Sequence, residues 1–216
     1  VTTLAGSGET GFADGVGTAA SFGEPSGLVV DADGNVLVAD RWNHRIRKID
    51  PQGAVTTLAG SGQMDFADGV GAAASFNWPK GVALDGDGHL LVTDTENHRI
   101  RKVSPDGVVT TLAGSGAVGD ADGVGAAASF CHPSGIVVDG DGVIVVSDEE
   151  NHLIRRISRD GAVTTVAGSG VEGFADGAGT AAQFSSPSGV ATTAKARRPR
   201  MPVAARTLTA PSSRVR

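Results

Sequence analysis

The side chains best suited to chemistry recur at fixed places along this chain. Three near-copies of one phrase each supply a histidine: NHRIRKI at 43–49, NHRIRKV at 97–103 and NHLIRRI at 151–157. Imidazoles bind metals and transfer protons, so one hypothesis is a single ion held by all three rings. The even recurrence also suits a structural hydrogen bond laid down once in every repeat.

A literal GxGxxG motif, typical of dinucleotide-binding loops, begins at residue 6 as GSGETG. The phosphate-binding form lies between a strand and a helix, with an acidic residue about 20 positions later. Here the motif returns at 114–119 and 168–173 among strand-like segments, and Asp65 interrupts the second copy. We interpret it as a glycine-rich connection between repeats and predict no cofactor.

Acidic phrases of the form DxDG suggest a calcium loop. They occur at 31–34, 85–88 and 139–142. The EF-hand loop places its glycine at the sixth position, whereas Gly88 stands at the fourth and strand-like residues follow. A hairpin turn uses Asp and Gly for their tolerance of positive φ. We favour the turn and predict no metal site.

Cys131 is the only cysteine, which excludes an internal disulfide and a thiolate-rich metal site. His132 follows it, but no orienting acid stands outside the repeat, and we predict a lone exposed thiol. Since no Ser/His/Asp or Cys/His set stands out, we predict that the chain is not an enzyme.

All these motifs belong to a repeat of 54 residues. VTTLAGSG starts at residues 1, 55 and 109, and 34 of the first 54 positions are identical in the next 54. Each unit contains four apolar, strand-like runs separated by turn residues, beginning near Pro25. The pattern predicts an all-β fold of β-propeller blades, each a four-stranded antiparallel meander. The histidines fall on third strands, whereas first strands line a propeller channel, so structural hydrogen bonding is favoured over a shared metal.

The repeat domain, residues 1–191, divides into complete and partial blades. The predicted pieces are complete blades at 25–60, 79–114 and 133–168, an orphan outer strand at 1–6 and a broken blade from 187. Three blades and two fragments are too few to close a ring. We therefore predict an open arc whose unpaired edges favour self-association.

Residues 192–216 form a basic Arg/Pro/Ala tail. The last 26 residues hold seven of the 18 lysines and arginines and no acidic residue. Three explanations stay open: translation in a wrong reading frame, a natural basic tail, or a diverged end. The composition predicts disorder. Because Val1 falls inside a strand-like phrase, we expect the chain to be a piece of a longer protein.

The phrase Asn-His-(Arg/Leu)-Ile-Arg follows Val-x-Asp and Gly-(Leu/Val/Ile)-x-x-Asp-x-Asp-Gly in every unit. This pattern resembles the NHL-repeat family over residues 1–191. The resemblance implies a propeller, commonly six-bladed, that generally serves as a binding platform. It also implies that the Asp, Asn and His of each phrase fix blade geometry. These residues are Asp40, Asn43, His44, Asp94, Asn97, His98, Asp148, Asn151 and His152.

Three local expectations concern individual side chains. Ile46 and Ile49 are three apart, which predicts either burial on opposite faces of a blade or a bulge. Arg45 and Arg47 are expected to reach acids at the rim, in salt bridges worth about 0–1 kcal/mol. Asp14 is expected to cap a short helical turn before Phe22.

Positions that differ between copies cluster in the blade connections and in the loop between second and third strands. In a four-strand meander these two connections emerge on the same face. We predict that this acidic, Trp-bearing face binds a protein partner, although drift in solvent loops after recent duplication would give the same pattern. The candidate residues are Glu24, Trp42, Trp78, Glu96, His132 and Glu149.

A non-catalytic binding scaffold is therefore the leading function. A propeller enzyme of the metal-dependent lyase or lactonase type would need unique His, Asp or Glu on the first strands, where only the repeated Asp occurs. RNA binding would need a basic face, yet residues 1–190 hold 24 acidic and 11 basic residues, so nucleic acid is disfavoured. No apolar run approaches the roughly 20 residues of a membrane span, and the compartment stays open.

Overall fold

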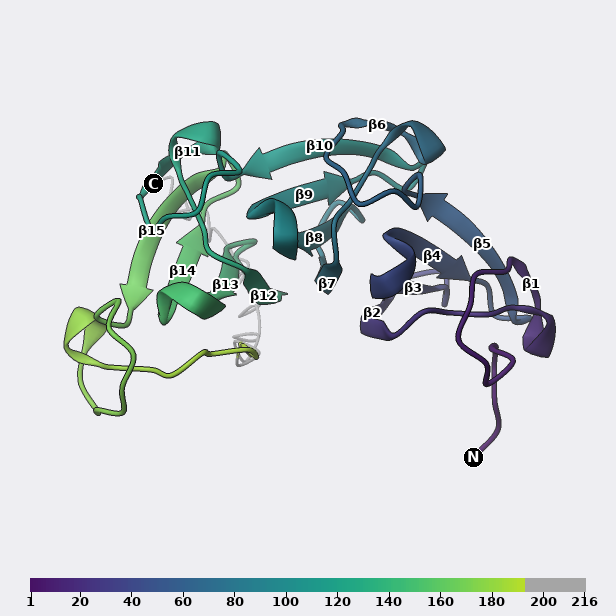
Figure 1. Ribbon diagram of the computed structural model, residues 1–216, viewed down its shortest axis with the longest axis horizontal. Helices are drawn as coiled ribbons and strands as arrows, with labels where there is room; N and C mark the ends of the chain where they lie inside the picture. The colour runs from purple at the N-terminus through teal and green to yellow at the C-terminus, as the bar shows by residue number, and fades with distance from the viewer. Residues whose placement is uncertain (193–216) are drawn as a thin grey trace, which may run out of the picture.

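A computed structural model describes residues 1–192, so the tail predicted from residue 192 lies outside this part except for its first residue. Figure 1 shows three twisted sheets side by side along an arc, with β2, β7 and β12 on the inner side. The sheets do not close into a ring. The predicted all-β fold of propeller blades in an open arc is confirmed.

Each blade is an antiparallel meander whose strand order follows the chain from the inner to the outer side. The first blade contains β2 (Pro25–Val30), β3 (Val36–Asp40), β4 (Arg45–Ile49) and β5 (Ala54–Ala59). The second contains β7 (Pro79–Leu84), β8 (Leu90–Asp94), β9 (Arg99–Val103) and β10 (Val108–Ala113). The third contains β12 (Pro133–Val138), β13 (Ile144–Asp148), β14 (Leu153–Ile157) and β15 (Ala162–Ala167).

The connection that precedes each blade adds a fifth, two-residue strand that the sequence did not predict. These edge strands are β1 (Gly15–Val16), β6 (Gly69–Val70) and β11 (Gly123–Val124), paired with β5, β10 and β15. 3₁₀ turns follow as η1 (Gly17–Ala19), η3 (Gly71–Ala73), η5 (Gly125–Ala127) and, after the third blade, η7 (Gly179–Ala181). Others join second to third strands: η2 (Arg41–Asn43), η4 (Thr95–Asn97) and η6 (Glu149–Asn151). None of the helical turns within residues 1–192 has the length and apolarity needed to cross a membrane.

Two local predictions at the start of the chain are wrong. Residues 1–6 form no strand, because the third strand that an outer strand would pair with is absent there. Instead, the N–H of Gly6 donates to the carbonyl of Gly17, which holds the segment against η1. Asp14 does not cap that turn, whose N-cap residue Val16 makes no side-chain bond.

The core lies between blades. Ile46 belongs to a buried cluster shared with the second blade, whereas Ile49 belongs to one that Ala5 and Phe22 cover. A bulge between Ile46 and Arg47 also shifts the register against β5. Both explanations offered for the spacing therefore hold, and each blade buries apolar side chains on both faces.

The inner strands approach so closely that some positions have no room for a side chain. A Cβ added to Gly81 on β7 would overlap the carbonyl oxygen of Ser134 on β12, whereas nothing lies near a Cβ at Gly86. We expect Gly81→Ala to destabilise the protein by about 1–3 kcal/mol through overpacking. Gly86→Ala serves as the matched control in urea unfolding and should change stability by no more than about 1 kcal/mol. Equal midpoints for the two variants would contradict this account of the packing.

Candidate partner-binding face

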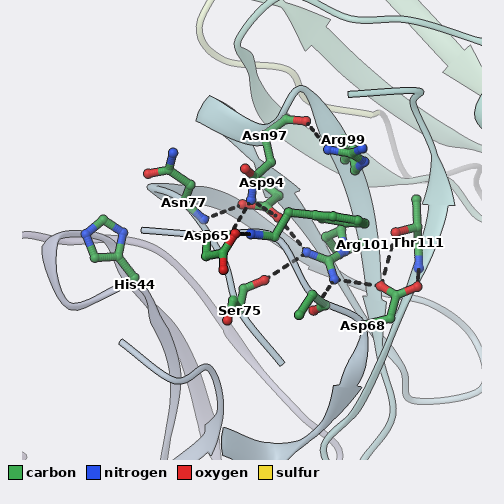
Figure 2. A network of polar contacts seen from close by, with 12 residues as sticks. His44, Asp65, Asp68, Ser75, Asn77, Asp94, Asn97, Arg99, Arg101 and Thr111 are labelled. Atoms are coloured by element: carbon green, nitrogen blue, oxygen red, sulfur yellow. Dashed lines mark hydrogen bonds and ion pairs between the residues drawn. The ribbon is translucent and has the colours of Figure 1, made fainter. Parts of the chain in front are cut away.

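A buried arginine anchors each blade to the connection that precedes it. In the second blade, Arg101 is fully buried. Its Nη1 donates to Asp94 at 2.6 Å and to the carbonyl of Ser75 at 3.1 Å, as Figure 2 shows. Its Nη2 donates to the carbonyl of Ala67 at 2.8 Å and to Asp68 at 2.7 Å. One side chain thus joins β8 and β9 to the connection over residues 65–77.

The carboxylate opposite this arginine is also fully buried and fully engaged. Asp94 accepts from the N–H of Asn77 at 2.8 Å and from Nδ2 of Asn97 at 2.9 Å, besides Arg101. Asn97 donates in addition to the carbonyl of Asp65 at 3.0 Å. Burial raises the pKa of the Asp94 carboxyl, against the charge of Arg101 and these donors.

The other blades repeat this pair. Arg47 meets Asp40 at 2.6 Å and Arg155 meets Asp148 at 2.7 Å, with all four side chains fully buried. Arg47 also reaches the half-exposed Asp14 at 2.6 Å, as expected, but its guanidinium is fully buried under the blade connection and not at the rim. The expected contact of Arg45 with an acid is wrong, because its guanidinium donates to the carbonyls of Asn43 and Ser61 at 2.9 Å. A desolvated ion pair constrains its surroundings more than a surface one, because each partner is costly to leave alone.

The repeated histidines connect each blade to the next. Each follows a 3₁₀ turn in the left-handed region, with φ between 51° and 55°. In each case a backbone N–H of the next unit donates to Nδ1 of the histidine. The N–H of Trp78 donates to His44 at 3.2 Å, that of His132 to His98 at 3.2 Å and that of Ser186 to His152 at 3.1 Å. The histidines thus act as clamps between successive units.

Two of the predicted residues and a neighbouring variable residue gather around one guanidinium near the boundary of the first and second blades. This first junction cluster consists of Glu24, Arg41 and Trp78. The Arg41 guanidinium lies 4.3 Å from the centre of the Trp78 ring and 3.8 Å from the Glu24 carboxylate. Cation–π contacts of this kind contribute about 0.5–2 kcal/mol. Trp78 therefore supports the junction.

A second junction cluster joins the second blade to the third. His132 lies 3.4 Å from the Glu96 carboxylate, and its ring meets that of His98 edge-on at 4.7 Å. Lys80 donates to Glu149 at 2.6 Å across the same boundary. Three of the six predicted partner residues thus contact another blade here. Sequence reasoning missed Lys80, the partner of Glu149, although this position varies between copies.

Trp42 differs from these residues because it stays available. Its side chain is 49% exposed, and its indole N–H has no hydrogen bond within residues 1–192. Its backbone N–H donates to the carbonyl of Gly23 at 2.9 Å, which brings η2 beside the blade connection. Met64 and Val118 in later connections are also well exposed. Both vary between copies, which was the signal that could have found them.

The prediction of an exposed thiol at Cys131 is wrong. The side chain is buried, and its backbone N–H donates to Asp148 at 2.7 Å. Burial raises the pKa of this thiol, and the charges of Asp148, Glu150 and Glu96 act in the same direction. A thiol held protonated in this way is a poor nucleophile.

The DxDG phrases form the expected tight turns. Asp85 Oδ1 accepts from the backbone N–H groups of Asp87 at 3.0 Å and His89 at 2.9 Å, and Gly88 has a φ of 82°. The side chains of Asp85, Asp87 and His89 could each offer one ligand atom to a single ion. The Lys102 ammonium already lies 3.0 Å from Asp85, however, which supplies a positive charge in place of an ion.

Comparison with known proteins identifies this arrangement. The family model described as NHL repeat matches residues 22–49, 76–103 and 130–157. These three segments are NHL repeats. Each match of the NHL repeat covers the end of a blade connection and the first three strands of one blade, which includes the buried arginine pair and the histidine clamp.

Individual relatives match only part of the chain. NHL repeat-containing protein 2 of Homo sapiens is 41% identical over 95 residues, which cover 42% of this chain and 13% of that protein. Protein SUPPRESSOR OF QUENCHING 1, chloroplastic, of Arabidopsis thaliana is 40% identical over 91 residues, 42% of this chain and 9% of its own. The crystal structure of a putative phosphatase from Bacteroides thetaiotaomicron matches with a TM-score of 0.56 and 26% identity, over 65% of this chain and 35% of that one. The chain thus spans a small fraction of the relatives it matches.

Removing one partner of the buried ion pair tests its structural role. Asp94→Asn leaves the guanidinium of Arg101 buried without its main counter-charge, and we expect a loss of about 3–5 kcal/mol. The control Glu150→Gln removes an exposed carboxylate and should stay within about 0.5 kcal/mol. Urea unfolding followed by circular dichroism measures both. Similar midpoints for the two variants would show that the pair is not an anchor.

The histidine clamps give junction stability a dependence on pH. Burial and then the charge of Arg45 lower the pKa of His44 below the unfolded value near 6.5. The unfolded chain therefore takes up a proton first as pH falls, so this contribution is complete above pH 6.5 and declines below it. His44→Asn keeps a residue that tolerates positive φ but does not titrate.

We expect wild-type stability, measured by thermal melting at pH 7.5 and 5.5, to fall more than that of His44→Asn. Since both proteins share every other titrating group, the difference isolates the clamp. Parallel declines would exclude a contribution from His44.

Proposed function

We propose that this chain is a non-catalytic binding scaffold whose variable face receives a protein partner. The observation that carries the proposal is Trp42, a half-exposed indole on the face where the copies differ. Exposed aromatic side chains on loops held by a rigid scaffold are enriched at binding hot spots. Met64 and Val118 add exposed apolar surface to the blade connections that reach the same end of the blades.

The six candidate residues differ in how available their side chains are to a partner. Trp78, Glu96, His132 and Glu149 are engaged at blade junctions, so changes there would act on the fold as well as on a partner. Glu24 is exposed and lies near Arg41. Drift after duplication would account for variation at a solvent position, but it does not favour an exposed Trp there. Trp42 is therefore the central contact of the proposal.

The family also includes propellers with other uses. The inner strands β2, β7 and β12 read PSGLVV, PKGVAL and PSGIVV, so they place no His, Asp or Glu beside a channel. An enzyme of the lyase or lactonase type would need such groups from elsewhere in a longer protein. The acidic excess over residues 1–190 works against an RNA backbone. Protein binding remains the use that the described surface supports best.

Substitution of Trp42 separates binding from folding. We expect Trp42→Ala to keep stability within about 0.5 kcal/mol, as for other exposed sites, while losing a hot spot worth about 2 kcal/mol of binding. The control Val16→Ala alters another exposed apolar residue, on the outer edge strand β1. Quantitative affinity capture should show proteins held by wild type and Val16→Ala but depleted at least about tenfold with Trp42→Ala. Identical capture by all three proteins would reject the proposed face.

A further inference from the structure

Arginine side chains lie against the aromatic rings of this fold. Residues 1–167 contain seven Phe and Trp residues, and a guanidinium lies within 5.3 Å of the ring centre of six of them. Arg45, for example, lies 3.8 Å from the ring of Phe12, and Arg99 lies 3.7 Å from that of Phe66. Trp42 is the seventh ring, and no arginine of the described chain lies over it. This half-exposed ring therefore has room for a cation from a second molecule.

Exposed carboxylates occupy the positions of the second and third blades that correspond to the surroundings of Trp42. In each unit, the Asn of the loop between second and third strands donates to a carbonyl of the preceding blade connection. Figure 2 shows this bond between Asn97 and Asp65. The bond places the connection beside the residue that precedes the Asn, which is Trp42 in the first blade. In the other two blades, exposed acidic residues lie on both sides of this contact: Asp65 with Glu96, and Asp120 with Glu150.

The basic residues of this face are already engaged, whereas these four acidic residues have no basic side chain as a close partner. Lys80 pairs with Glu149 at 2.6 Å, and Arg41 lies 3.8 Å from Glu24. The guanidinium groups of the third strands that are not buried donate to backbone carbonyls. Within residues 1–192, no lysine or arginine forms an ion pair with any of the four acids, and only His132 contacts one of them. Their charges remain available to a ligand.

The third blade also lacks a cation that the first two blades have on this face. Leu153 replaces the arginine found as Arg45 and Arg99, and Asp120 replaces the phenylalanine that this arginine covers. An arginine and a ring thus give way to an apolar side chain and a carboxylate. The negative charge of Asp120 and Glu150 therefore has less compensation than that of the acids on the second blade.

We propose that the partner contacts this face through an arginine-rich segment, an inference that rests on the proposed function of the face. One arginine covers the ring of Trp42, as Arg41 covers that of Trp78. Arginine suits both parts of the face, because its guanidinium stacks on aromatic rings and also pairs with carboxylates. Since the carboxylates are exposed, binding weakens as salt is added. The other arginines of the segment pair with Asp65, Glu96, Asp120 and Glu150.

Fluorescent peptides of equal length test this chemistry on the full 216-residue chain. One peptide alternates arginine with glycine and serine, and two others carry lysine or the neutral citrulline in place of arginine. We expect fluorescence anisotropy to show that the wild type binds the arginine peptide, binds the lysine peptide more weakly and does not bind the citrulline peptide. Added salt should lower the affinity for the arginine peptide.

Matched variants assign the binding to this face. Trp42→Ala should lower affinity for the arginine peptide about three- to tenfold, whereas Trp42→Phe keeps a ring and should retain most of it. The double variant Asp120→Asn/Glu150→Gln should lower affinity about threefold or more. Its control, Asp33→Asn/Asp106→Asn, removes two exposed carboxylates from turns at the opposite end of the blades and should leave affinity within about a factor of two. The basic residues of 193–216 are common to all variants, and circular dichroism checks folding.

The outcomes separate this inference from the proposed function. The inference is overturned if the wild type does not bind the arginine peptide, or binds the lysine or citrulline peptide as tightly. It is also overturned if Trp42→Ala binds as the wild type does, or if the two double variants lose affinity equally. Protein capture that depends on Trp42 but is not competed by the arginine peptide would leave the proposed function standing and overturn the arginine-rich partner. Capture of no protein through Trp42 would count against the proposed function itself.

Discussion

The buried arginine–aspartate pair is the constraint on which the rest of each blade depends. Arg101 and Asp94 are both fully buried, and their charges are tolerable only because every neighbour is positioned to meet them. The donors and acceptors come from the second strand, the 3₁₀ turn, the third strand and the preceding blade connection. A connection that shifted would leave a charge in the interior without a partner.

This anchor explains why one face of the array can vary while its geometry does not. The connection is held by its carbonyl groups, by one backbone N–H and by the repeated carboxylate of Asp68, so the side chains at other positions, such as Trp78 and His132, are free to differ. The structure uses that freedom in two ways. Some variable side chains contact the adjacent blade, as Arg41 contacts the ring of Trp78. Others, such as Trp42, stay about half exposed.

Much of the fold could be predicted from the sequence, because the 54-residue period and the alternating strands are repeated signals. The same recurrence predicted a structural role for the histidine and Asn positions, whose side chains make repeated hydrogen bonds in the structure. Burial of Arg47 was not predictable, since arginine is usually exposed and two of its four acceptors are carbonyl groups that carry no sequence signal. The two-residue edge strands were missed because Gly-Val is too short to show a period. Contacts across a junction, such as that between Glu96 and His132, depend on which residues of two blades become neighbours in space. The sequence of one repeat does not contain this information.

The clamps also bear on how such an array folds. The bonds from Trp78 to His44, from His132 to His98 and from Ser186 to His152 all join residues 34 positions apart. Adding units therefore leaves the sequence separation of the junction contacts unchanged, and folding rate depends on that separation. Each unit can form against its neighbour alone, as in linear repeat arrays. The entropy of chain closure thus stays constant per blade, however many blades the array contains.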